Sequence, residues 1–77
     1  GQDCTAACRV YARAGIYDRL LERLVPAVES LNVGNIEEES SDMGPLVSAR
    51  QRHRVSGFVE RAKELRHAEV LTGGKQP

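Results

Sequence analysis

Two apolar stripes with helical spacing are the feature that most limits how this 77-residue chain can fold. The first stripe lies between residues 16 and 31 and consists of Tyr17, Leu20, Leu21, Leu24, Val28 and Leu31. The second stripe consists of Val55, Phe58, Val59, Ala62 and Leu65. Apolar residues that recur every three or four positions lie on one face of a helix. The sequence therefore predicts two amphipathic helices, each of which packs one face against other parts of a protein.

Individual residues predict where these helices begin and how they run. Asp18 falls in the first turn expected for a helix over residues 16–31, where a negative charge suits the helix dipole. Pro26 lies inside this helix and removes one backbone hydrogen bond, which predicts a kink near Glu22, with two shorter helices as the alternative. The segment Ser48-Ala49-Arg50-Gln51 has the form of a capping box and predicts the first turn of the second helix.

The remaining segments predict an α/β fold class. Residues 4–8 favour a short helix, and residues 9–12 and 68–72 favour two short strands. Residues 32–45 form a loop, and its acidic run Glu37-Glu38-Glu39 is interpreted as a solvated connection, because adjacent carboxylates alone do not make an ion site. The expected order is short helix, strand, long helix, loop, helix and strand. This order predicts a βαβ-like unit with parallel strands and a right-handed crossover.

The composition predicts that this unit is not self-sufficient. A chain of this size buries only about 60% of the surface of its unfolded form, and this one has no Trp, one Phe, two Tyr and 29% charged residues. Two helices also cover only one face of a parallel sheet, which needs both faces covered. We therefore expect residues 1–77 to be a single partial domain of a larger body, and self-association of the isolated chain is an expected consequence.

Charge and cysteine content exclude several function classes. Eleven basic and eleven acidic residues give zero net charge, and this balance predicts neither a nucleic-acid partner nor an anionic membrane partner. No segment approaches the roughly 20 apolar residues of a membrane span. Cys4 and Cys8, with His53 or His67, do not match a zinc-ligand spacing, so no metal is expected. Unpaired thiols favour a reducing, cytoplasmic setting.

The opening segment, Gly1-Gln2-Asp3-Cys4-Thr5-Ala6-Ala7-Cys8-Arg9, carries the candidate chemistry. It places Cys4 just after a glycine turn and just before residues that can begin a helix. A helix N-terminus favours the thiolate, which is the nucleophilic form of cysteine. Cys4 is therefore the candidate reactive thiol of the chain.

This segment resembles the active-site segment of the aldehyde dehydrogenase superfamily, in which the cysteine of N-x-G-Q-x-C is the catalytic nucleophile. The resemblance extends along the whole chain through Arg9-Val10-Tyr11, Gly15-Ile16-Tyr17-Asp18, Asn32-Val33-Gly34, Met43-Gly44-Pro45 and Thr72-Gly73-Gly74. The string from Asp3 to Tyr11 is most similar to the aminoaldehyde branch, in particular to 4-aminobutanal dehydrogenases.

The resemblance implies a catalytic role for Cys4. Its thiolate would attack an aldehyde to form a thiohemiacetal, which NAD(P) oxidises to a thioester that is then hydrolysed to the acid. The backbone N–H of Cys4 would help to hold the oxyanion. Asp3 is a substrate-binding candidate that would face the ammonium group of an aminoaldehyde, with a solvated surface role as the alternative, and Thr5 would line the pocket or begin the helix. Cys8 is interpreted as a small buried hydrophobic residue.

The resemblance also implies what lies elsewhere. NAD or NADP would be bound by a separate domain, because this sequence contains no glycine-rich phosphate loop. No cofactor-binding residue is therefore assigned, and the isolated chain is expected to be inactive, whereas the complete enzyme is expected to be a homo-oligomer. The alternative is a stand-alone helical module whose apolar stripes bind a partner helix.

Overall fold

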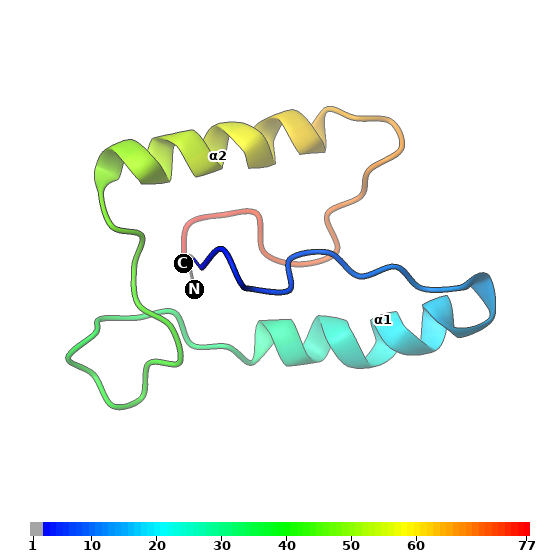
Figure 1. Ribbon diagram of the computed structural model, residues 1–77, viewed down its shortest axis with the longest axis horizontal. Helices are drawn as coiled ribbons and strands as arrows, with labels where there is room; N and C mark the ends of the chain where they lie inside the picture. The colour runs from blue at the N-terminus through cyan, green and yellow to red at the C-terminus, as the bar shows by residue number, and fades with distance from the viewer. Residues whose placement is uncertain (1–2) are drawn as a thin grey trace.

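The computed structural model of the protein describes residues 3–77 and contains two helices. Helix α1 spans Ala14–Glu29 and helix α2 spans Ala49–Lys63. The two helices run in opposite directions, and the segments that precede α1 and follow α2 pass through the space between them in the view of Figure 1. The two amphipathic helices predicted from the apolar stripes are thus present.

Helix α1 is shifted by two residues from the predicted range of 16–31, because it begins at Ala14 and ends at Glu29. Its first turn contains no acidic residue, so the prediction that Asp18 lies in that turn is wrong. The helix runs through Pro26 without interruption, and the alternative of two shorter helices is also wrong. A proline lacks an N–H donor, but its carbonyl can still accept a helical hydrogen bond. The carbonyl oxygen of Pro26 still accepts a hydrogen bond from the Ser30 N–H at 3.0 Å.

Helix α2 begins where the capping sequence predicts. Ser48 is the N-cap residue with extended backbone, and its Oγ accepts a hydrogen bond from the Gln51 N–H at 3.2 Å. This bond satisfies one of the four backbone donors that the first turn of a helix leaves unpaired. Arg61 and Lys63 lie in the last turn, where positive charge suits the negative end of the helix dipole.

A closed loop joins the helices, as predicted, and Asn32 holds its two ends together. The Asn32 N–H donates to Asp42 Oδ2 at 2.9 Å, and the Asn32 side-chain amide donates to the Ser40 carbonyl at 2.8 Å. A parallel bridge between Val33 and Met43 completes the closure. The acidic residues 37–39 are all exposed on this loop, consistent with a solvated connection.

The predicted strands do not form within residues 3–77. Residues 9–12 have no regular secondary structure and residues 68–72 contain none beyond bends, while the predicted short helix at residues 4–8 is reduced to one turn and a bend. A strand is stable only when a neighbouring strand accepts its backbone hydrogen bonds. Since neither segment has such a neighbour here, the α/β fold class stays a prediction about a larger sheet.

The helices do not close a core. None of the residues from 3 to 77 is buried, and the accessible surface is 7387 Å², compared with about 4,700 Å² for a compact monomer of this mass. The radius of gyration is 14.2 Å, compared with about 11.5 Å for a compact chain of this length. Side chains of the stripes remain exposed, among them Phe58, which is 58% exposed. The fold therefore presents two apolar faces that this chain does not cover.

Candidate functional site

Cys4 lies in a tight turn that its two neighbours hold in place. Asp3 Oδ1 accepts two hydrogen bonds from Thr5, one from the backbone N–H and one from the hydroxyl, both at 2.8 Å. The Ala6 N–H donates to the Asp3 carbonyl at 3.2 Å and closes the turn. Aspartate commonly forms this kind of turn because its short side chain reaches the backbone two residues on. Asp3, Cys4 and Thr5, the three predicted site residues, are thus brought together by local bonds.

The electrostatics of the turn are dominated by the Asp3 carboxylate. The Thr5 N–H, followed by the Thr5 hydroxyl, holds the pKa of Asp3 below its ordinary value, because both donors stabilise the charged form. Asp3 is therefore ionised at neutral pH. Its first observable role is to position Thr5 and to fix the backbone on both sides of Cys4.

The arrangement leaves the Cys4 thiol open to solvent. Cys4 is free and exposed, and the alanines that follow it are small. The Thr5 N–H is committed to Asp3, so it does not serve as an oxyanion donor in this conformation. The predicted role of the Cys4 N–H as an oxyanion donor stays a prediction. Gly1 and Gln2 of the motif lie outside the described residues.

Two features of this segment differ from expectation. Cys4 does not precede a helix directly, because α1 begins only at Ala14. Cys8 is exposed and free, so the interpretation of Cys8 as a buried hydrophobic residue is wrong. The reason is that this segment contacts no closed core that could enclose a side chain. The thiols of Cys4 and Cys8 are therefore both exposed to solvent.

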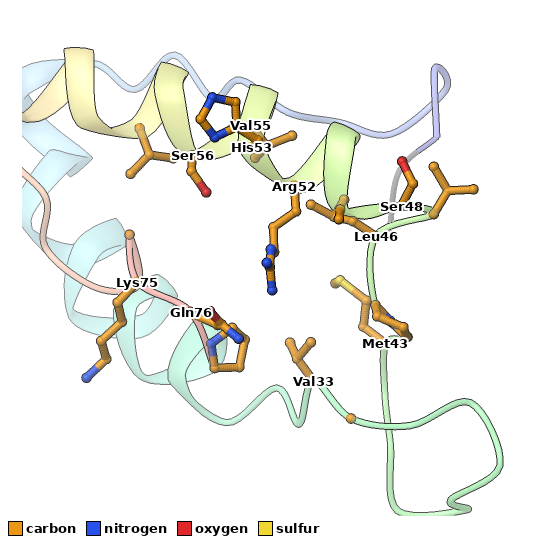
Figure 2. Close-up of a pocket in the computed structure, with 18 of the residues that line it drawn as sticks. Val33, Met43, Leu46, Ser48, Arg52, His53, Val55, Ser56, Lys75 and Gln76 are labelled. Atoms are coloured by element: carbon orange, nitrogen blue, oxygen red, sulfur yellow. The ribbon is translucent and has the colours of Figure 1, made fainter.

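The larger groove of the molecule lies elsewhere (Figure 2). It is bordered by the closed loop at Val33 and Met43, by α2 and by residues 74–77, and Arg52 projects toward its centre. A smaller apolar groove lies between α1, α2 and residues 69–72. None of residues 3–5 lines either groove. The lining of the larger groove includes Ser56, His53, Glu60 and Lys75, and no hydrogen bond joins these four side chains to one another among those described for residues 3–77.

Gly73 and Gly74 both have φ of 69°, the left-handed region that favours glycine. The part of the chain that the structure describes contains no cluster of three or more His, Cys, Asp or Glu side chains suited to a metal ion. Neither helix is long and apolar enough to cross a membrane.

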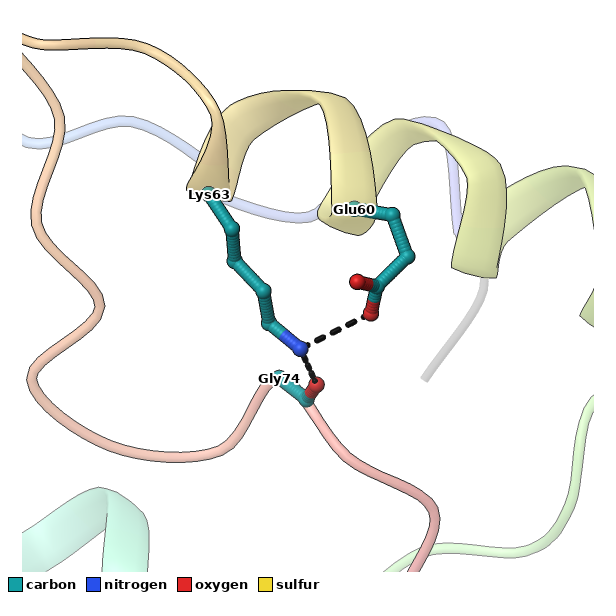
Figure 3. Close-up of polar contacts among 3 residues, drawn as sticks. All are labelled: Glu60, Lys63 and Gly74. Carbon is teal, nitrogen blue, oxygen red and sulfur yellow. Dashed lines mark hydrogen bonds and ion pairs between the residues drawn. The ribbon is translucent and has the colours of Figure 1, made fainter.

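Sequence reasoning did not identify Lys63 as a structural contact. Its Nζ donates to Glu60 Oε1 at 2.8 Å and to the Gly74 carbonyl at 2.7 Å, and so fastens residues 73–77 to α2 (Figure 3). The spacing of Glu60 and Lys63 by three positions indicates an ion pair on a helix surface. Nothing in the spacing indicates the contact with Gly74, which is 11 positions away along the chain.

The amino-acid sequence is similar to those of known proteins along its whole length. The pattern described as "Aldehyde dehydrogenase family" matches residues 1–77. The mitochondrial aldehyde dehydrogenase of Leishmania tarentolae is 41% identical over 76 residues, covering 99% of this chain and 15% of the relative. The glutarate-semialdehyde dehydrogenase of Pseudomonas putida is 40% identical over 75 residues, covering 97% of this chain and 15% of the relative. The betaine aldehyde dehydrogenase of Mesorhizobium japonicum is 38% identical over 77 residues, covering 100% of this chain and 16% of the relative. The chain thus spans about 15% of the length of these relatives.

The hydrogen bonds of the turn predict how the Asp3 carboxyl titrates. We expect the Asp3 carboxyl to titrate below the ordinary aspartate value of about 3.9, because Thr5 stabilises its charged form. The folded pKa is lowered, so the two hydrogen bonds are fully present above the ordinary value. They are lost only as the pH falls through the lowered one. An NMR titration of the Asp3 carboxyl carbon measures this. Thr5→Val should raise the pKa part of the way and the distant control Thr72→Val should not, whereas titration at or above the ordinary value contradicts the turn.

Proposed function

Because this chain belongs to the aldehyde dehydrogenase family, we propose that it carries the nucleophile of an NAD(P)-dependent oxidation of aldehydes to carboxylic acids. The observation that carries the proposal is Cys4, a free and exposed thiol within Gly1-Gln2-Asp3-Cys4-Thr5, held in a turn by Asp3. The chain spans about 15% of the length of these relatives, so the remainder of the active site is assigned to other residues of a complete enzyme.

The proposed chemistry takes place at the Cys4 sulfur. The thiol loses its proton, and the thiolate forms a carbon–sulfur bond with the aldehyde carbon while the carbonyl π electrons move to oxygen, which gives a thiohemiacetal. Other residues of the complete enzyme would hold a nicotinamide cofactor, which would accept the hydride lost from the adduct carbon as the adduct becomes a thioester. Water then adds to the thioester carbonyl, and the carbon–sulfur bond breaks to release the acid and the Cys4 thiol. The turn at Asp3 contributes by holding the backbone around Cys4 so that the sulfur remains accessible.

We assign no residue of this chain to cofactor binding, since these 77 residues contain no glycine-rich phosphate-loop motif. The 77-residue chain alone is therefore expected neither to bind NAD nor to oxidise aldehydes. Isothermal calorimetry with NAD should give no saturable heat, and a saturable isotherm would contradict this assignment.

The α/β fold class is proposed for the complete domain. There, residues 9–12 and 68–72 would pair with strands from the rest of the enzyme, whose layers would cover the apolar faces of α1 and α2. The large exposed surface of this chain supports that proposal. The alternative, a helical interaction module, would rest on the same exposed faces of α1 and α2 and on no other feature. These faces also account for the expected self-association of the isolated chain. A homo-oligomer is proposed for the complete enzyme on family resemblance alone.

A cytoplasmic location is proposed because both cysteines are free. The relative from Leishmania tarentolae is named as mitochondrial, so a mitochondrial location is the alternative. Separating the two compartments and assaying each for the protein distinguishes these locations.

We propose an aminoaldehyde such as 4-aminobutanal as the substrate. The support is the ionised Asp3 carboxylate beside Cys4, which would attract an ammonium group carried by the aldehyde, together with the similarity of the string from Asp3 to Tyr11 to the aminoaldehyde branch. Thr5 donates its hydroxyl to Asp3, so it positions that carboxylate. Direct contact of Thr5 with the substrate stays a prediction.

The role of Cys4 is tested in the complete enzyme by comparing two cysteines of one segment. Cys4→Ser should lower kcat by about 10³-fold or more, because the weaker serine nucleophile lacks the thiolate. Cys8→Ser is the matched control and should stay within about 3-fold of the parent, since Cys8 has no part in the reaction. Production of reduced nicotinamide measures both. Retained turnover in Cys4→Ser, or an equal loss in both variants, would refute the assignment.

The substrate proposal is tested by changing the charge of Asp3. Asp3→Asn keeps an oxygen that can accept from Thr5 but removes the charge, so KM for 4-aminobutanal should rise about 10-fold while KM for butanal changes little. Asp3→Ala also removes the turn and should raise KM for 4-aminobutanal by at least as much. Steady-state kinetics with both aldehydes measure the difference. Equal effects on the charged and uncharged aldehydes would sink the idea.

A further inference from the structure

We draw no further inference here: the strongest candidate, the larger groove between the closed loop at Val33 and Met43, helix α2 and residues 74–77, toward whose centre Arg52 projects, is an open surface, and nothing in the structure shows what covers it.

Discussion

The uncovered apolar faces of α1 and α2 are the constraint on which the rest of the structure depends. Folding is driven mainly by removing apolar surface from water, and a chain of this size has little interior to offer. Here the two stripes form helices, yet no residue between 3 and 77 is buried. The regular structure that persists is local: an N-cap at Ser48, a closed loop at Asn32 and a turn at Asp3. The cap and the turn join residues two or three positions apart, whereas the loop is closed by Asn32 across 8 and 10 positions.

This reliance on local bonds explains why the turn around Cys4 is defined while its surroundings are open. The hydrogen bonds from Thr5 to Asp3 span two positions and need no support from the fold. They hold the backbone around Cys4 but supply no wall, no base and no cofactor. A nucleophile in such a setting depends on partners that only a larger body provides, because desolvated and pre-oriented groups account for most of the rate of an enzyme.

The sequence by itself determined the elements that depend on neighbouring residues. The stripes predicted both helices, Ser48 and Gln51 predicted the start of α2, and the motif around Cys4 predicted the family to which the chain belongs. These succeed because spacing, capping and motif chemistry act over a few positions. The sequence also predicted one helix through Pro26, whereas the exposure of Cys8 and the contact of Lys63 with Gly74 were decided only by the tertiary structure. The strands at residues 9–12 and 68–72 belong with these, because a strand forms only when a partner strand is present.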